Sequence, residues 1–261
     1  MTGRIELVPG GRPEAWLLRL DGMDQSFVDL ADPSRLEFDY VRRLGDAVDA
    51  WPTAGPVRIV HVGGAGLSLA RYVAATRPGS RQVVLEPDEE VTELVRRDLP
   101  LPRRSGIKIR PVDGRTGLAQ LRDDGADLIV LDAYADARVP GELVTAEAAA
   151  EAARVLSPSG WLLANLTDRA PFPWVRRVVA AVRTALPSLM VSAEPATLRA
   201  RRPGNLLVVA GRGEVPVAAL RSTARAGAAP YRVLDRRQVD DRLGGGRPFR
   251  DADQESSPRF G

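Results

Sequence analysis

Three acidic residues each end an apolar stretch that has the length and composition of a buried strand. Glu86 and Asp132 follow the stretches 83–85 and 128–131, and Asp113 ends a third. A carboxylate accepts hydrogen bonds from ligand hydroxyls and amines, and parallel sheets bind ligands at the edge where their strands' carboxyl ends meet. The three acids therefore indicate one ligand-binding edge at the carboxyl ends of the strands.

A glycine-rich turn follows the apolar stretch 57–62 and contains Gly63, Gly64 and Gly66. Because such a turn lacks side chains, a ligand can approach the backbone and the first turn of the next helix. Glu86 lies twenty residues after Gly66, where an acid accepts hydrogen bonds from both hydroxyls of a ribose. A close strand-to-helix turn without a ligand is the alternative, but the acid in register favours nucleoside binding.

The pair Asp113 and Gly114 indicates which nucleoside this edge would bind. An acid at a third strand end provides an acceptor for the exocyclic amine of adenine, although the pair alone equally indicates a turn or a helix cap. Together with Glu86, it favours an S-adenosyl-type nucleoside. We expect NAD to bind poorly, because this strand end suits adenine rather than a second nucleotide.

The composition excludes several other kinds of site. The chain has 261 residues with no cysteine and one histidine, His61, which excludes disulfides, thiol catalysis and a histidine-rich metal site. We therefore expect no metal. Since His61 lies inside an apolar strand, we interpret it as a packed residue rather than a base.

Charge and hydropathy bear on two further partners. The 37 cationic and 34 acidic residues leave a net charge of +3, which is too small to indicate nucleic-acid binding. No apolar run approaches the roughly 18 residues of a membrane span, and the first residues lack a signal-peptide hydrophobic region. We expect a cytoplasmic protein with neither nucleic acid nor membrane as a partner.

From residue 57 the sequence alternates short apolar stretches with helical patterns. Strands are expected near 57–62, 81–86, 107–112, 127–132 and 160–166, and helices near 67–76, 88–97, 115–122, 141–156 and 172–185. This alternation predicts a parallel sheet with helices on both faces. The apolar segments 188–193 and 205–210 have no long helix between them and predict an antiparallel pair that closes the sheet edge.

The first fifty residues predict short antiparallel strands at 5–8, 15–20 and 26–30, followed by a helix that opens at Pro33 and Ser34. We therefore expect an α/β fold with a methyltransferase-type, Rossmann-like, mostly parallel sheet and an antiparallel edge strand, preceded by a small N-terminal β-hairpin region. The expected regions are 1–50, the catalytic domain 51–240, and a disordered tail 241–261 that is rich in glycine and polar residues.

Segments between residues 15 and 210 resemble the spermidine synthases. The stretches 20–26 (LDGMDQS) and 36–40 (LEFDY) are similar to the LDG..Q and DEF.YHE segments of that family, and the glycine turn and the acids follow in the same order. These enzymes bind decarboxylated S-adenosylmethionine and transfer its aminopropyl group to putrescine. The resemblance implies that Glu86 holds the ribose, that Asp113 with Gly114 holds the adenine, and that Asp132 faces the reacting amine.

The resemblance also implies an acceptor pocket lined by Gln25 and Tyr40. Tyr134, two residues after Asp132, is either an aromatic residue packed over the site or a surface ring. Similar proteins often dimerise through their N-terminal strands, so we expect a homodimer.

The sequence departs from the family where that family binds cations. Gly66 replaces the acid that holds the donor's amine, Arg42 replaces a glutamate, and Ala135 replaces a second acid near the reacting amine. Asp136 is the candidate that compensates from one position further along. The polyamine site is incompletely matched, and we expect putrescine to be a poor acceptor.

The sequence favours a transferase that moves an aminopropyl group from an S-adenosyl-type nucleoside to a small amine. Two alternatives remain open: a methyltransferase that uses S-adenosylmethionine on a small amine or another small acceptor, and a non-catalytic, oligomeric nucleoside-binding protein.

Overall fold

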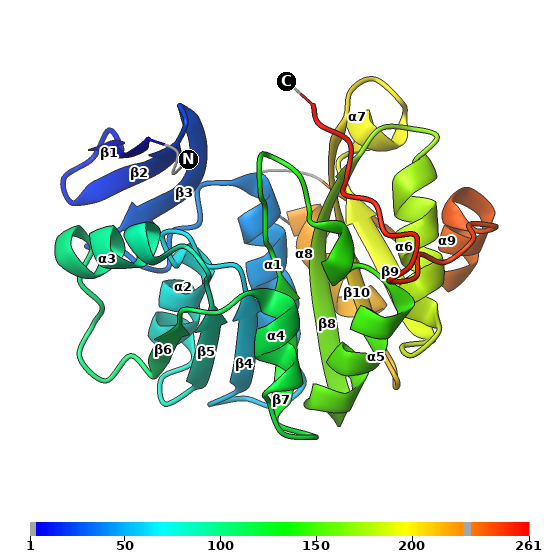
Figure 1. Cartoon of the computed structure of the whole chain (residues 1–261), viewed down its shortest axis with the longest axis horizontal. Helices are drawn as coiled ribbons and strands as arrows, with labels where there is room; N and C mark the ends of the chain where they lie inside the picture. The colour runs from blue at the N-terminus through cyan, green and yellow to red at the C-terminus, as the bar shows by residue number, and fades with distance from the viewer. Residues whose placement is uncertain (1–3, 227–230, 261) are drawn as a thin grey trace.

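The computed structural model describes residues 4–226 and 231–260, which form two sheets with helices around the larger one (Figure 1). The smaller sheet is antiparallel and contains β1 (Ile5–Pro9), β2 (Ala15–Leu20) and β3 (Met23–Asp29). Leu18 and Val28 of this sheet pack with Leu67 and Val84 in one apolar core. The N-terminal strands are thereby attached to the main sheet beside its glycine turn.

The larger sheet is mostly parallel. Its strands are β4 (Arg58–Val62), β5 (Arg81–Leu85), β6 (Ile107–Arg110), β7 (Ala126–Leu131), β8 (Leu156–Asp168), β9 (Ser188–Ala193), β10 (Gly204–Gly211) and β11 (Arg232–Leu234), in the order β11-β9-β10-β8-β7-β4-β5-β6. The pairs from β8 through β7, β4 and β5 to β6 are parallel. β10 is antiparallel to β8 and β9, and the edge strand β11 is antiparallel to β9.

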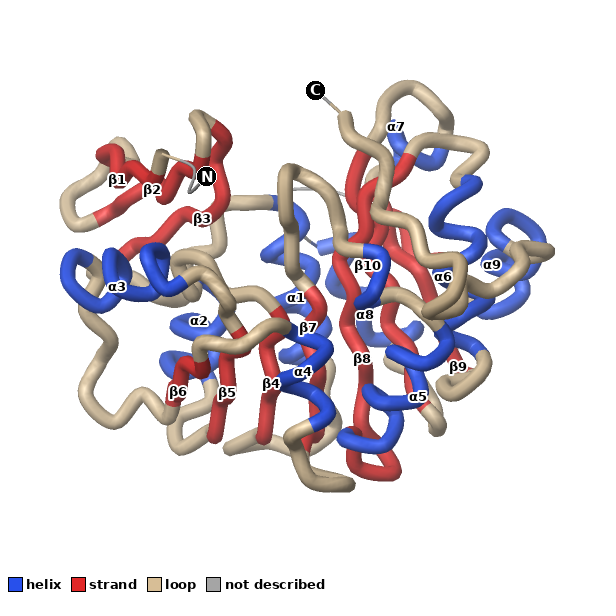
Figure 2. Tube along the Cα trace, in the orientation of Figure 1, coloured by secondary structure: helices blue, strands red, loops and turns tan. Residues whose placement is uncertain are grey.

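Helices cover both faces of this sheet (Figure 2). They are α1 (Asp39–Asp49), α2 (Ser68–Thr76), α3 (Glu89–Asp98), α4 (Gly114–Ala119), α5 (Ala146–Val155), α6 (Pro173–Arg183), α7 (Pro195–Leu198), α8 (Val217–Ala226) and α9 (Arg236–Leu243), with a 3-10 turn at Gly141–Leu143. Because successive strand residues point to opposite faces, Ile59 packs with α1, α2 and α8, whereas Val60 belongs to the core of α4, α5, α6 and α9. None of the helices in the described ranges is both long and apolar enough to cross a bilayer.

The structure confirms the expected fold class, including the antiparallel edge and the N-terminal hairpin region. The helix expected from Pro33 begins only at Asp39, because the Arg42 guanidinium donates to the carbonyl oxygens of Leu36 (2.6 Å) and Glu37 and holds that stretch in a non-helical conformation. The helix expected at 141–156 is divided, since the Thr145 side chain caps a new start at α5. β11, α8 and α9 were not predicted. The region boundaries at residues 50 and 240 stay a prediction.

The tail is the clearest correction to the sequence interpretation. Disorder was expected from residue 241, yet α9 continues to Leu243 and residues 244–260 pack against the body of the protein. Phe249 is fully buried beside Trp174, and the Arg177 guanidinium lies 3.8 Å from its ring centroid. The segment is rich in glycine and polar residues, and such a composition predicts disorder. It does not indicate that Phe249 is buried or that the segment forms the hydrogen bonds described below.

Candidate functional site

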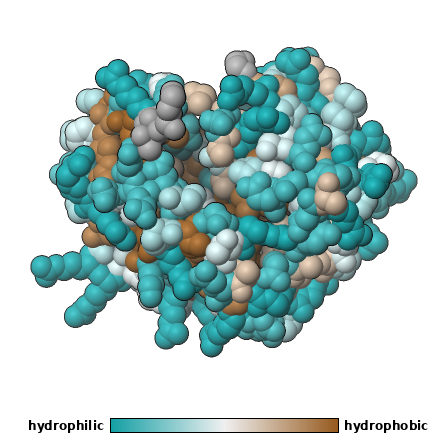
Figure 3. Space-filling view, in the orientation of Figure 1, coloured by the Kyte–Doolittle hydropathy of each residue, from teal (hydrophilic) through white to brown (hydrophobic). Residues whose placement is uncertain are grey.

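A cavity of about 240 Å³ opens at the carboxyl ends of β4, β5 and β7, against the edge of β3. In the space-filling view this face is hollowed between the N-terminal sheet and the rest of the molecule (Figure 3). Of the predicted site residues, those that line it are Gln25, Tyr40, Gly63, Gly64, Glu86, Asp113, Gly114, Asp132 and Tyr134. Side chains far apart in sequence are therefore brought together as expected.

Two of the predicted residues do not line the cavity. Gly66 lies under β3: its amide donates to Ser26 Oγ (3.0 Å), and a side chain at this position would collide with Ser26 and Val28. Asp136 is exposed in a tight turn with a positive φ of 50°, and its backbone oxygen accepts hydrogen bonds from Arg259. Neither residue is placed where it could hold a ligand in this cavity.

The backbone of the glycine turn lies close to the ends of the neighbouring strands. Gly63 has a φ of +85°, and a side chain there would collide with the backbone of Asp132 and Ala133. A Cβ at Gly64 would lie 2.6 Å from Val84 Cγ1 and 3.6 Å from Glu86 Oε2. Any side chain at these positions would therefore displace the strand ends or obstruct the carboxylate.

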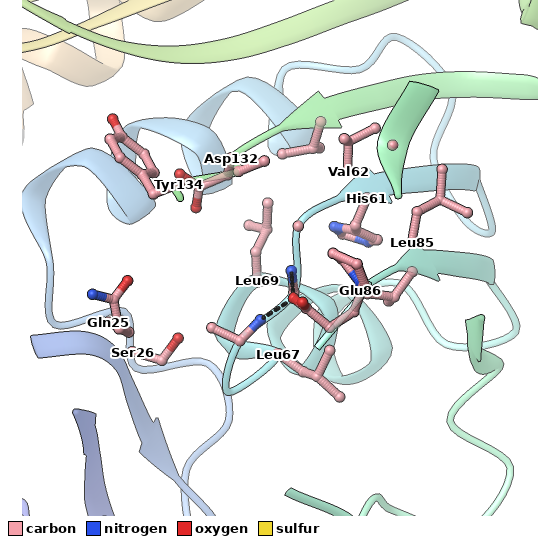
Figure 4. Close-up of a pocket in the computed structure, with 18 of the residues that line it drawn as sticks. Gln25, Ser26, His61, Val62, Leu67, Leu69, Leu85, Glu86, Asp132 and Tyr134 are labelled. Carbon is pink, nitrogen blue, oxygen red and sulfur yellow. Dashed lines mark hydrogen bonds between the residues drawn. The ribbon is translucent and has the colours of Figure 1, made fainter. Parts of the chain in front are cut away.

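Glu86 ties this turn to the end of β5. Its Oε2 accepts hydrogen bonds from the amides of Gly64 (2.9 Å) and Ala65 (3.2 Å), and its Oε1 accepts from Asp88 N (3.1 Å). Figure 4 shows the bonds from the Gly64 and Ala65 amides as dashed lines, with Asp132 and Tyr134 on another side of the cavity and Gln25 and Ser26 on a third. The carboxylate thus both organises the turn and faces the ligand space.

Asp113 is the N-cap of α4 and also lines the cavity. Its Oδ1 accepts a hydrogen bond from Thr116 N (2.8 Å), and bonds from Thr116 hold the Asp113 pKa below its usual value. A Cβ at Gly114 would collide with Val62 and come 3.0 Å from Leu143 Cδ2. The pair is therefore a helix cap by geometry, and a role toward adenine stays a prediction.

Asp132 is oriented by asparagine side chains from two strands. Asn165 of β8 donates to Asp132 Oδ1 (2.9 Å), and Asn205 of β10 donates to Asn165 Oδ1 (2.9 Å). The Asn165 amide also donates to the Tyr134 hydroxyl (3.3 Å), which shares a further hydrogen bond with Thr167 Oγ1 (2.7 Å). Tyr134 is thereby fixed over the site rather than on the open surface.

The buried setting shifts the proton affinity of these groups. Burial raises the pKa of Asp132 to about 6, and the hydrogen bond from Asn165 opposes part of that rise. Burial, followed by the negative charge of Asp132, also raises the pKa of Tyr40 and of Tyr134. At pH 7 the carboxylate is therefore mainly ionised but more basic than usual, beside two protonated phenols.

His61 also lines the cavity, on β4. Its Nε2 bonds Gln82 Oε1 (2.9 Å), and Gln82 Nε2 donates to the carbonyl oxygen of Ala70 (2.9 Å), so the His61 Nε2 carries the proton. Burial lowers the pKa of His61 to about 4, against the opposing effect of the Gln82 bond. A neutral, hydrogen-bonded ring agrees with its interpretation as a packed residue.

Three residues around Asp132 were not found from the sequence. Asn165 and Asn205 form the chain that reaches Asp132, and the buried Arg43 of α1 donates to the carbonyl oxygens of Ser192 (3.0 Å) and Asn205 (3.2 Å) behind it. The sequence could have indicated the two asparagines, because each is a polar residue in an otherwise apolar stretch, 160–166 for Asn165 and 205–210 for Asn205. In contrast, Arg42 bonds Leu36, Glu37 and Asp39 and does not line the cavity.

No protein-family model matches the chain. A curated relative, the polyamine aminopropyltransferase of Vibrio vulnificus, is 30% identical over 133 residues, which are 50% of this chain and 44% of the relative. The matched region thus spans less than half of that relative's length. A solved structure, a probable spermidine synthase from Corynebacterium glutamicum, is 28% identical with a TM-score of 0.88, covering 95% of this chain and 92% of that one.

Two more distant structures share the fold. Human methyltransferase-like protein 13, in complex with SAH, is 19% identical with a TM-score of 0.60, covering 73% of this chain and 90% of that one. A spermidine synthase in complex with the transition state analogue AdoDATO is 15% identical with a TM-score of 0.58, covering 92% of this chain and 80% of that one. The sheet and its helices define a methyltransferase-type α/β protein. Within that class, the chain is similar in sequence to a polyamine aminopropyltransferase and in sequence and structure to a probable spermidine synthase.

Proposed function

We propose that this protein is a spermidine synthase-like transferase that binds an S-adenosyl-type nucleoside and moves an aminopropyl group to a small amine. The observation that carries the proposal is Asp132, held by Asn165 in the same cavity as the glycine turn and Glu86. A base beside a nucleoside-binding edge is the arrangement that such a transfer requires. The similarity to a polyamine aminopropyltransferase and to a probable spermidine synthase supports it.

The residues of the adenosyl side fit a nucleoside. The absence of side chains at Gly63 and Gly64 leaves the backbone and Glu86 open to a ribose, and Asp113 with Gly114 lies on the same side for the adenine. Related folds have been solved with SAH and with AdoDATO, which are both adenosyl compounds. We propose decarboxylated S-adenosylmethionine as the cosubstrate, with S-adenosylmethionine itself as the alternative.

When bound, decarboxylated S-adenosylmethionine supplies a carbon next to a sulfonium, to which an amine adds as methylthioadenosine leaves. An amine at neutral pH is mostly protonated and must lose a proton before it forms the new bond. Asp132 accepts that proton, since its carboxylate is ionised at pH 7 and its pKa is raised to about 6. Asn165 keeps the carboxylate oriented throughout.

The acceptor side fits one ammonium better than two. The other predicted lining side chains there, Gln25, Tyr40 and Tyr134, are neutral, and the remaining acids of the cavity, Glu86, Asp113 and Glu142, lie on or beside the strand end and helix start of the adenosyl side. The donor-amine acid is absent because Gly66 lies under β3, and Ala135 stands where the family has a second acid. Arg42 does not add repulsion, because it points away from the cavity. Putrescine, a dication, is therefore expected to be a poor acceptor.

The proposal is tested by incubating the protein with decarboxylated S-adenosylmethionine and a panel of amines, and by measuring released methylthioadenosine. We expect release with a monoamine, little with putrescine, and none above background in Asp132→Asn. Turnover of putrescine at about 1 per second or faster, abolished in Asp132→Asn, would show that the missing acids were overinterpreted. No release with any amine would refute the transfer.

A methyltransferase is the second candidate, because the adenosyl side does not distinguish the two cosubstrates and a single carboxylate also suits a small acceptor. The same incubation with S-adenosylmethionine, followed for S-adenosylhomocysteine, separates the two reactions. Binding without either product would leave the non-catalytic nucleoside-binding protein as the correct description.

We further propose a homodimer formed through the N-terminal strands. Apolar side chains gather on the face over β1 and β2 (Figure 3), and Met23 at the start of β3 is 44% exposed. Pairing with a second copy would cover this surface and the sheet edge. A monomeric mass at micromolar concentration in light scattering would contradict it. A cytoplasmic location stays a prediction.

A further inference from the structure

The segment 249–259, which we term the strap, runs along the loop 132–143 that follows β7 (Figure 1). The two segments exchange backbone and side-chain hydrogen bonds. Val139 N donates to Ser257 Oγ (2.9 Å), Ser257 N donates to Val139 O (3.0 Å), and Gly141 N donates to Ser256 Oγ (3.3 Å). Loop and strap are thus joined at consecutive positions.

Two arginines add to this contact from opposite directions. Arg138 of the loop donates to the carbonyl oxygens of Ser257 (2.5 Å) and Ser256 (3.0 Å). Arg259 of the strap donates to the carbonyl oxygen of Asp136 (3.0 Å). The bonds go to backbone oxygens, so that they fix the path of the chain on both sides.

The strap is itself anchored in the body of the protein. Phe249 is fully buried, and its carbonyl oxygen accepts a hydrogen bond from Ala146 N (2.9 Å). Asp251 accepts from Thr145 Oγ1 (2.7 Å) and pairs with Arg115 of α4 (2.6 Å), while Trp174 Nε1 donates to Glu255 O (2.7 Å). The strap therefore connects the loop to α4, α5 and α6.

The same loop forms one wall of the cavity through its other residues. Arg138, Val139 and Gly141 bond the strap, whereas Pro140 and the pair 142–143 line the cavity between and after them. One side of this short stretch faces the strap and the other faces the ligand space.

We propose that the strap holds this wall in its ligand-binding position before any ligand arrives, so that the cavity is preorganised. A loop without such a support would have to be ordered during binding, which lowers affinity. The claim that the strap raises the affinity for a ligand rests on the proposed function. The claim that the strap orders the loop 132–143 is independent of that function.

Gly141 offers a substitution that acts directly on the strap. A Cβ at this position would lie 2.7 to 3.0 Å from backbone atoms of Glu255, so Gly141→Ala pushes directly against the strap. The φ of Gly141 is not positive, and alanine is otherwise compatible with the backbone. Gly213→Ala is the matched control, since a Cβ there would meet nothing within 4 Å and φ is again not positive.

The experiment measures amide hydrogen exchange across residues 133–143 in the full-length protein and in both variants. We expect exchange at Val139 and Gly141 to accelerate at least about tenfold in Gly141→Ala and to stay near the wild-type rate in Gly213→Ala. Equal exchange in the two variants would overturn the proposal. If Gly141→Ala does not fold, Ser257→Ala replaces it, because that change removes the acceptor of the Val139 amide and otherwise only a long bond to the carbonyl oxygen of the adjacent Pro258.

Methylthioadenosine binding gives the second readout. We expect its affinity to fall about threefold to thirtyfold in Gly141→Ala or Ser257→Ala and to be unchanged in Gly213→Ala. Accelerated exchange with unchanged affinity would overturn the claim that the wall is preorganised for the ligand. If the wild-type protein binds no methylthioadenosine, the proposed function fails, and the exchange rates still decide whether the strap orders the loop.

Discussion

The adenosyl side and the acceptor side of the cavity are built in different ways. On the adenosyl side, Glu86 bonds backbone amides of a glycine turn only about twenty residues away, and Asp113 caps the helix that directly follows it. On the acceptor side, Asp132 depends on side chains from β8 and β10. The wall at 140–143, which we propose the strap holds, lies beside Gly114. An acid held by local backbone contacts depends on few other elements, whereas an acid held by distant side chains is altered by substitutions in any of several elements.

The difference matters for chemistry. The acids that the spermidine synthase resemblance assigns to the ribose and the adenine are kept, while three positions that bind cations in that family, now Gly66, Arg42 and Ala135, have lost theirs. Under the proposed function, we expect such a cavity to bind the nucleoside and to take a different acceptor. Separate tests of the two sides should therefore give separate results.

The largest expected effect is on the acceptor side. Asp132→Asn should lower turnover of the accepted amine by about 10²- to 10⁴-fold, because the proton acceptor is lost. Methylthioadenosine affinity should change less than about threefold, since the adenosyl contacts are intact. Steady-state kinetics and calorimetry on the same preparation measure both, and a parallel loss of affinity would show that the two sides are not independent.

On the adenosyl side, Glu86→Ala should weaken methylthioadenosine binding by about 1.5–3 kcal/mol, through lost bonds to the ribose and a loosened turn. The measurement is a calorimetric titration. Glu90→Ala, which removes an exposed acid from α3, is the matched control and should leave the affinity unchanged. Wild-type affinity in Glu86→Ala would remove the ribose role of this residue.

A smaller effect is expected on the free energy of unfolding, through the buried charge of Asp132. The Asp132 pKa is raised from 3.8 to about 6 in the folded protein, so the folded state binds the proton more tightly than the unfolded chain. The cost of the buried charge is absent below about pH 4, grows as pH rises to about 6, and is complete above it. Asn at this position carries no charge.

Asp132→Asn should therefore raise the free energy of unfolding by about 1–3 kcal/mol near pH 8, allowing for the part of the side chain that faces the cavity, and by little near pH 4. Urea denaturation at the two pH values checks this. A gain of equal size at both would show that the effect is not electrostatic.

The two sides also differ in how far the sequence could predict them. The glycine turn and Glu86 follow from residues near one another and from the alternation of strands and helices, so their meeting at the sheet edge could be anticipated. Asn165 and Asn205 meet only because β10 pairs antiparallel with β8, with Asn205 opposite Thr167 and Leu207 opposite Asn165. That register places the asparagines diagonally on one face, and no local pattern specifies it.

The strap was missed for another physical reason. A segment with many glycine and polar residues buries little apolar surface and so predicts disorder. Here Phe249 supplies one buried ring, and hydrogen bonds to loop and helix backbones supply the remaining contacts. These depend on partners more than 100 residues away in the chain, such as Val139 and Gly141.

The most direct test of the adenosyl site is one calorimetric series with methylthioadenosine, S-adenosylmethionine, its decarboxylated form and NAD. We expect at least one of the adenosyl sulfur compounds to bind in about the micromolar range, a free energy near −8 kcal/mol, and NAD to bind far more weakly. Binding of NAD with a submicromolar constant, or no binding of any adenosyl sulfur compound, would contradict the assignment of this cavity as an S-adenosyl nucleoside site.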